Sequence, residues 1–441
     1  MSEKYYAVEL QEIINDFNSN KFEIVIKKLN LLSINHPEDK IINRLFASTY
    51  FKITNWKKAI EYYEKTLFFE KDKFKIYNNI GFAYFKLGQI ENSINSFKKS
   101  IKENPSYFPT YNNLAISYNE IGRYNEVIQN FISALELNKK NIIAENGLIN
   151  IFNFIKPKNT DDHPLIEINK RINEISKKLK IESLDEIKNI ERIFSESENI
   201  IEELYGNISF RETQIYRKNK KNLNCKRHFQ IFNKFNIIPK FCFSCYKVQI
   251  NLNNVVDLIK LFFIFDYLHL EKNNTRKCII EMRDKIKGNY KGYIYCSGLN
   301  EAQKILDKLN KIITNSGIVD FEILIKHGCS EFYESYPKFE KINFKGSQEM
   351  QYRESWQVKE NIIDKENPAR LENDKKVFNE TLRGLNLSDI LIIKNWINYA
   401  DVIGDHSYKL IYKKKVKENF IKSFLQPQLN FRISQFLKLK N

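Results

Sequence analysis

Residues 76–105, IYNNIGFAYFKLGQIENSINSFKKSIKENP, decide the first part of the fold. Apolar residues recur three or four positions apart on both sides of Gly88, which is typical of two amphipathic helices joined by a tight turn. A small residue, Gly81, stands in the first run, and an aromatic residue, Phe97, stands in the second. The stretch therefore predicts a helical hairpin in which the two helices approach closely at Gly81.

The same pattern returns every 34 residues. Three sets of equivalent positions agree, namely Ala47, Gly81 and Ala115; Tyr50, Tyr84 and Tyr118; and Tyr63, Phe97 and Phe131. They define repeats at about 40–73, 74–107 and 108–141. A fixed period of this length indicates an α-helical solenoid, because each hairpin buries its apolar face against the next one.

Residues 76–105 resemble the tetratricopeptide repeat (TPR) family almost throughout, and the resemblance covers about a third of the chain. A degenerate repeat at about 6–39 precedes the regular ones and is expected to cap the array. A further first helix is expected over Ile142 to Phe154, before KPKNTDDHP breaks the pattern. The resemblance implies an N-terminal TPR solenoid over residues 1–155.

In such arrays the first helix of each repeat lines a concave surface that binds protein partners. The resemblance places five residues on that surface: Arg44, Asn78, Asn79, Asn112 and Asn113. Paired asparagines can hydrogen-bond a partner's backbone whatever its side chains are. The family's carboxylate clamp is not supported, because Ser48, Phe82 and Ile116 occupy one of its positions, and a more apolar ligand is favoured. The alternative is that the asparagines reflect composition and lie on a solvated surface.

Length and charge limit the possible organisation of the rest of the chain. With 441 residues, 42% of them hydrophobic, two or three domains are expected. Residues 1–150 hold 20 Lys and Arg against 17 Asp and Glu, so most of the net charge of +17 lies beyond them. We attribute about half of this basicity to a general bias toward Lys, Asn and Ile. The N-terminus lacks a secretory pattern and the apolar run Leu258 to Leu270 is interrupted by charges, so a cytoplasmic protein is expected.

Beyond the array the predicted class is mainly α, with an α+β domain. Residues 156–205 predict a helical linker, 206–335 a cysteine-bearing α+β domain, and 336–441 a loop and C-terminal helices. Between about 240 and 330, hydrophobic patterns alternate in the order β-α-β-β-α-β. That order predicts a ferredoxin-like arrangement. Trp356 and Trp396 are as compatible with packing as with binding.

Residues 206–250 contain ten basic residues against one acidic residue, Glu212, with aromatic residues between them. Single-stranded nucleic acid is bound by such mixtures, because cations neutralise phosphates while rings stack on bases. The candidates for this role are Arg217, Lys218, Lys220 and Lys221. The favoured alternative is an amphipathic helix, since Phe229, Phe232 and Phe235 follow helical spacing.

All six cysteines lie between residues 225 and 329. Two short-spaced pairs, Cys225-x2-His228 and Cys242-x2-Cys245, predict a zinc site, because each pair brings two ligands to one side of a tetrahedral ion. Zinc is thus the candidate cofactor. The alternatives are a redox pair at Cys242 and Cys245, or buried thiols without a common site.

The other cysteines are expected to differ in environment. Cys278 and Cys296 lie in predicted strands among apolar neighbours and are interpreted as packed thiols. Cys329 ends a predicted strand beside His327 and Glu331, which makes it the better candidate for an exposed or liganding cysteine.

The sequence contains no phosphate-binding loop, GxGxxG, HExxH or GxSxG motif. We therefore predict a TPR-mediated protein-interaction scaffold that recruits a partner to a C-terminal domain of undefined activity. One alternative is a TPR-fused enzyme, transferase-like or dependent on thiols or metal, with its site in the cysteine-bearing domain. The HPLIEIN segment weakly resembles the junction in TPR-fused transferases. The other alternative is a zinc-stabilised nucleic-acid-binding protein.

Overall fold

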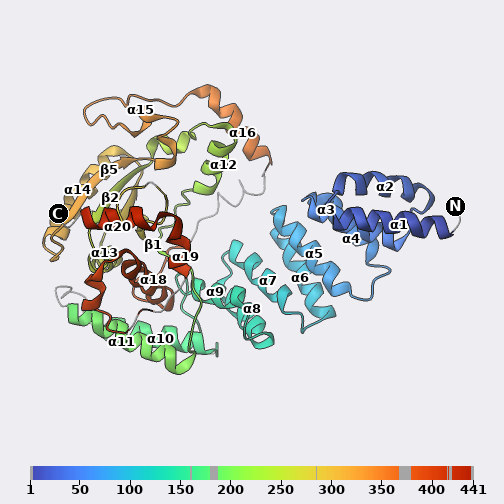
Figure 1. Cartoon of the computed structure of the whole chain (residues 1–441), viewed down its shortest axis with the longest axis horizontal. Helices are drawn as coiled ribbons and strands as arrows, with labels where there is room; N and C mark the ends of the chain where they lie inside the picture. The colour runs from blue at the N-terminus through green and yellow to red at the C-terminus, as the bar shows by residue number, and fades with distance from the viewer. Residues whose placement is uncertain are drawn as a thin grey trace. The chain divides into compact units, whose positions relative to one another are not determined.

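The computed structural model describes residues 3–158, 161–178, 187–284, 286–366, 379–414, 416 and 420–438. They form two compact units, which divide between Glu145 and Asn146 (Figure 1). The second unit gathers the described residues of all three segments that the sequence separated into a linker, a cysteine-bearing domain and a C-terminal part.

The first unit is a row of antiparallel helices. Their bounds are α1 (Glu3–Asn18), α2 (Phe22–Asn35), α3 (Lys40–Lys52), α4 (Trp56–Thr66), α5 (Lys73–Lys86), α6 (Ile90–Glu103), α7 (Phe108–Glu120) and α8 (Tyr124–Leu137). The next helix, α9 (Ile142–Ile151), starts where the sequence predicts a further first helix. Each predicted repeat is therefore one hairpin, and the degenerate segment at 6–39 is a hairpin as well.

The turn between the helices of each hairpin needs a residue with positive φ. Gly88 (φ 74°) and Gly122 (φ 71°) supply it, as do Asn20 (φ 58°) and Thr54 (φ 61°) at the equivalent positions. These four residues are spaced by 34 along the chain. Glycine adopts this conformation without steric cost and asparagine at a small one, so the turn is conserved in geometry even where the glycine is absent.

Close approach of the paired helices explains the small residues of the repeat pattern. A Cβ atom added to Gly81 would lie 2.7 Å from ring carbons of Phe97, and the equivalent Ala47 and Ala115 are fully buried. Larger side chains there would push the two helices apart. The predicted contact between the small and aromatic positions is confirmed.

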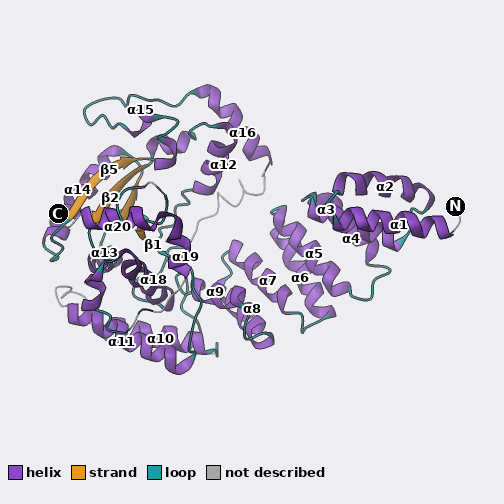
Figure 2. Cartoon of the chain, viewed as in Figure 1, coloured by secondary structure: helices purple, strands orange, loops and turns teal. Residues whose placement is uncertain are grey.

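The second unit combines helices with a sheet (Figure 2). Its helices are α10 (Pro164–Lys178), α11 (Ile187–Leu204), α12 (Cys225–Phe235), α13 (Val255–Tyr267), α14 (Leu299–Thr314), α15 (Pro337–Glu340), α16 (Gln357–Glu366), α18 (Leu387–Ile403), α19 (Phe420–Leu425) and α20 (Leu429–Lys438). Its strands are β1 (Gln214–Arg217), β2 (Tyr246–Leu252), β3 (Arg276–Ile280), β4 (Tyr290–Cys296) and β5 (Phe321–His327). No helix in the described ranges is long and apolar enough to cross a membrane.

The strands form an antiparallel sheet in the order β1-β3-β4-β2-β5. From β2 to β5 the elements follow one another as the sequence predicts, strand, helix, strand, strand, helix, strand. The sequence did not predict β1, a short strand that pairs with β3 at the edge of the sheet. Helices α13 and α14 cover one face, where a Cβ on Gly292 of β4 would lie 2.4 Å from the Leu261 side chain. The opposite face carries polar side chains.

Buried ion pairs hold the second unit together across long sequence distances. The Arg217 guanidinium on β1 donates to the Asp389 carboxylate of α18 at 2.9 and 3.1 Å, and to Asp266 of α13. Arg217 is 6% exposed and both aspartates are buried. Trp396 of α18 is fully buried and donates to the Thr213 carbonyl at 2.8 Å, so it is a packing residue.

Candidate functional site

The predicted groove asparagines divide into buried and accessible members. Asn112 and Asn141 are buried and exchange two side-chain hydrogen bonds of 3.1 and 3.3 Å. Asn78 is buried too, and its Oδ1 accepts from Thr110 and Asn113. Asn78 and Asn112 therefore join successive repeats to each other and do not face a partner, because burial and internal hydrogen bonds occupy them.

Asn79 and Asn113 remain half-buried on the first helices. Their amide nitrogens donate within the array, to the Tyr63 hydroxyl at 3.2 Å and to Asn78 at 3.0 Å. Each carbonyl oxygen can still accept a hydrogen bond from a partner backbone. One turn further along the same helices lie Phe82, half-buried, and Ile116, 37% exposed. This row of residues is the candidate partner-binding surface.

Arg44, the fifth predicted partner-binding residue, is exposed and lies 3.5 Å from Glu70. Both side chains are accessible to water, 60% and 27% exposed, so the ion pair contributes little to stability. Arg44 is free to exchange this contact for one with a partner.

The four residues predicted to bind nucleic acid lie in different environments. Arg217 is buried in the ion pairs described above, so assigning it to phosphate binding was wrong. Lys218 is exposed, with its ammonium 5.1 Å from the centre of the Tyr216 ring. Lys220 and Lys221 line a pocket to which Lys218 does not contribute. The amphipathic-helix interpretation of α12 is confirmed instead, since its phenylalanines pack against the buried cluster around Ile231 and Phe332.

The predicted zinc ligands do not form a metal-binding group. Within the described residues, no three His, Cys, Asp or Glu side chains are placed to hold an ion together. His228 is buried on α12 and stacks on Phe241, with ring centroids 5.1 Å apart. The cysteines are all free thiols. Packing of α12 against the aromatic cluster fixes the direction of His228, which the spacing in the sequence could not indicate.

Cys225, Cys242, Cys245 and Cys329 nevertheless lie near enough to influence one another. Burial raises the pKa of the Cys245 thiol to about 11, and it also raises the pKa of Cys225 and of Cys242. The neighbouring thiols reinforce the increase. These three cysteines therefore retain their protons near neutral pH, which is unfavourable for a redox thiolate.

Cys278 and Cys296 are buried on β3 and β4, as expected of packed thiols. Cys329 is partly exposed, and its sulfur accepts from the Lys247 ammonium at 3.1 Å. His327 does not join it. The ring nitrogens of His327 lie 2.9 Å from the Phe339 carbonyl and 3.1 Å from the Phe243 carbonyl, and the ring is buried.

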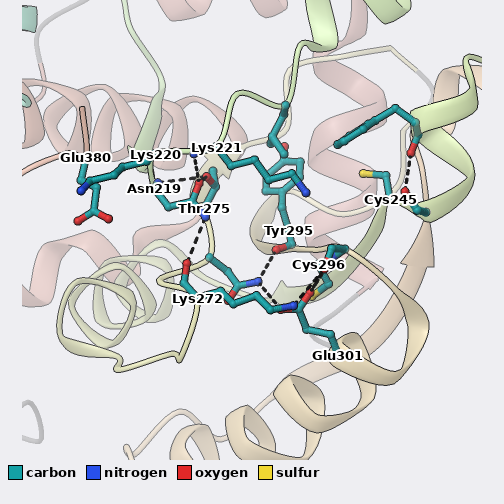
Figure 3. A pocket seen from close by; sticks show the side chains of 15 residues that line it. Asn219, Lys220, Lys221, Cys245, Lys272, Thr275, Tyr295, Cys296, Glu301 and Glu380 are labelled. Carbon is teal, nitrogen blue, oxygen red and sulfur yellow. Dashed lines mark hydrogen bonds and ion pairs between the residues drawn. The ribbon is translucent and has the colours of Figure 1, made fainter. Parts of the chain in front are cut away.

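A pocket of about 290 Å³ lies beside β3 and β4 (Figure 3). Lys220 and Lys221 enter it from the segment after β1, Cys245 from the segment before β2, and Tyr295 and Cys296 from β4. The pocket thus collects residues from three distant parts of the sequence. Its size suits a small ligand or ordered water.

Glu301, one of the two acidic residues that line this pocket, is held by internal hydrogen bonds. Glu301 accepts from the Ser297 backbone at 2.6 Å, from the Ser297 hydroxyl at 2.8 Å and from Asn274 at 3.2 Å, and Lys272 lies 3.2 Å away. Burial alone would raise the pKa of Glu301, but these donors lower it to about 2. Glu301 is therefore a fixed carboxylate in the first turn of α14, and it is not a proton donor near neutral pH.

Comparisons with known proteins identify the repeats. Two family models described as tetratricopeptide repeat match residues 74–107 and 96–129. The chain therefore contains a TPR segment. No curated protein matches the sequence.

Several solved structures share a likeness with part of the chain. A crystal structure of MamA is 18% identical over 31% of this chain and 81% of its own, with a TM-score of 0.30. MamA from Desulfovibrio magneticus RS-1 is 14% identical over 34% and 85%, with a TM-score of 0.32. The second TPR domain of human RPAP3, solved in complex with an HSP70 peptide, is 23% identical over 25% and 91%, with a TM-score of 0.24.

Proposed function

We propose that the TPR segment binds an extended, partly apolar segment of a protein partner and holds it near the C-terminal α+β unit. The observation that carries this proposal is the repeated pair of a half-buried asparagine and an apolar side chain that is at least partly exposed on successive first helices, Asn79 with Phe82 and Asn113 with Ile116. An extended peptide presents backbone N–H groups and side chains alternately, so both kinds of group would be used.

Neighbouring contacts limit the kind of partner. Phe82 packs against Phe51 and Trp56, with ring centroids 5.5 and 5.9 Å away, which gives the surface a firm apolar floor. Lys86 lies 5.0 Å from the Phe82 ring centre. A partner segment with apolar residues and an acidic flank would satisfy both groups.

For the α+β part we propose a ferredoxin-like module formed by β2 to β5 with α13 and α14. The order of elements and the antiparallel pairing support it. In this proposal β1 and α18 are additions that complete the core through the Arg217 ion pairs.

The partner proposal can be tested with a displayed library of random peptides selected on the full chain. The binding of an enriched peptide is then measured by fluorescence anisotropy for the natural chain and for variants. Ile116→Asp should weaken it about tenfold or more, because a charge replaces an apolar contact. The double variant Asn79→Ala, Asn113→Ala should weaken it less.

Asn95→Ala is the matched control, since Asn95 is exposed on the second helix α6 of the same array. It should leave the affinity unchanged. If the selected peptides bind Ile116→Asp and the asparagine variant as tightly as they bind the control, this surface is not the binding surface.

A further inference from the structure

The polar face of the sheet collects basic side chains from separate strands. Lys247 lies on β2, paired in register with Lys326 of β5 on one side and with Tyr295 of β4 on the other. Lys277 on β3 is paired with Tyr293 of β4. Side chains of paired residues share a face of the sheet, so these groups point away from α13 and α14.

These side chains line a cavity of about 160 Å³. The groups that matter to its chemistry are Lys247, Lys277, Lys326, Arg283, Glu331 and Cys329. Four cations thus face one carboxylate. The cavity is separate from the pocket of Figure 3, although Tyr295 contributes to both.

Ion pairs neutralise only part of this charge. Arg283 donates to Glu331 at 2.7 Å and to Glu281 at 2.7 and 2.9 Å. Glu281 also accepts from Lys291 at 3.2 Å. Both carboxylates are therefore occupied by these two cations.

The remaining three lysines have no carboxylate within ion-pairing distance in the described residues. Lys247 is 8% exposed and donates to Cys329, and Lys326 donates to the Ser330 hydroxyl. Lys277 lies 5.3 and 5.9 Å from the ring centres of Tyr216 and Tyr293. Lys247 is buried and Lys277 and Lys326 are half-buried, and withdrawing cations from water without counter-charges is unfavourable, so the fold maintains a site that an anion would stabilise.

The electrostatics of Lys277 and Lys326 agree with this geometry, whereas for Lys247 burial is outweighed by Cys329 and Tyr295, which raise its pKa. Burial, together with the charges of Lys247 and Arg283, lowers the pKa of Lys277 to about 8. Burial and the charge of Lys247 likewise lower the pKa of Lys326 to about 8. A bound anion would reverse both effects, because an opposite charge favours the protonated lysine.

We propose that this cavity, which we call the lysine cavity, binds the phosphate group of a small molecule. Three ammonium groups converging from different strands suit a compact, multiply charged anion, since a lysine acts on phosphate as a point charge. The volume admits a phosphate with a few further atoms and is too small for a nucleotide. The tyrosine rings provide the apolar walls.

The experiment measures inorganic phosphate binding to the full chain by calorimetry, with chloride as background salt. The natural chain should bind phosphate, and Lys277→Met should reduce the affinity at least tenfold through loss of a charge-assisted contact. Lys304→Met, at an exposed position on α14, is the control and should bind as the natural chain does.

A second measurement locates the anion and is independent of the calorimetry. Cys329 borders the cavity, so phosphate should slow its alkylation by iodoacetamide, followed by mass spectrometry of the Cys329 peptide. In Lys277→Met the protection should require much more phosphate. Thermal unfolding of each variant verifies that it is folded, and Lys326→Met replaces Lys277→Met if the latter is not.

Three results would overturn the proposal. The first is no phosphate binding at millimolar concentration, and the second is equal binding by Lys277→Met and Lys304→Met. The third is binding that leaves Cys329 alkylation unchanged, which would place the anion elsewhere. Competition by a phosphoserine peptide would contradict the assignment of the ligand to a small molecule, and its failure would support that assignment.

Discussion

The array and the polar face of the sheet treat buried polar groups in opposite ways. In the array, buried amides and hydroxyls bond to one another, as Asn112 does with Asn141 and as Ser93 does with Ser117 at 3.1 Å. On the polar face of the sheet, Lys247 is buried, and Lys277 and Lys326 are half-buried, without carboxylate partners in the described residues. Neutral groups that hydrogen-bond to one another stabilise the stacking of repeats. Cations without a counter-charge lower the stability of the fold, and they can bind an anionic ligand. The difference separates residues that build the fold from residues available to a ligand.

The second unit also contains buried charges that are fully paired, and they provide the sharpest contrast. Arg217→Met leaves Asp266 and Asp389 buried without a counter-charge, so we expect a loss of about 3–5 kcal/mol in the free energy of unfolding. Urea denaturation of the full chain measures it. The control is Arg192→Met, which removes an exposed pair with Glu196 and should cost less than about 1 kcal/mol. Equal effects would show that the buried pairs are not structural.

The array depends on close helix contact more than on charge. Gly81→Val places side-chain atoms where Phe97 already lies, 2.7 Å from the Cβ position, and overpacking costs about 1–3 kcal/mol. Loss of helical circular dichroism on heating should occur at a lower temperature than in the natural chain. Lys75→Val, exposed on the same helix, is the control. A normal melting temperature for Gly81→Val would contradict the close contact.

The unpaired cations should make stability depend on pH. Because the pKa of Lys277 is about 8 in the folded chain and near 10.5 when unfolded, the unfolded state binds more protons between these values. Stability should therefore rise as pH increases from about 8 toward 10.5, by up to about 3 kcal/mol. Urea midpoints at pH 7.5 and 9.5 test this sign.

In Lys277→Met that rise should become smaller, and the variant should be at least as stable as the natural chain at pH 7.5. A lower stability of Lys277→Met at that pH would mean that Lys277 has a structural partner. An unchanged pH dependence would mean that other groups cause it.

The smallest effect concerns the turns of the array. Thr54 adopts φ 61° where the later repeats have glycine, and a β-branched residue is strained in this region. Thr54→Gly should therefore stabilise the chain by about 1 kcal/mol. The reverse change, Gly122→Thr, should destabilise it by a similar amount. If Thr54→Gly lowers the melting temperature, the turn conformation at Thr54 differs from that at Gly88.

Sequence patterns predicted the elements of the second unit better than its contacts. The order of helices and strands from β2 to β5 could be predicted, because the hydrophobic periodicity of each element lies within its own residues. The edge strand β1 was missed because Gln214–Arg217 is too short to show alternation. Arg217 was assigned to nucleic acid because its neighbours in the sequence are basic, whereas its partners Asp266 and Asp389 lie far along the chain.

The 34-residue period by itself determined the array, because each repeat forms the same hairpin and contacts mainly the next one, so spacing in the sequence becomes spacing in the structure. It could not determine which asparagines are buried, since that depends on how successive hairpins stack. The lysine cavity was decided by tertiary structure alone. Lys247, Lys277 and Lys326 come together only through the pairing register of strands from separate segments, and no local pattern encodes that register.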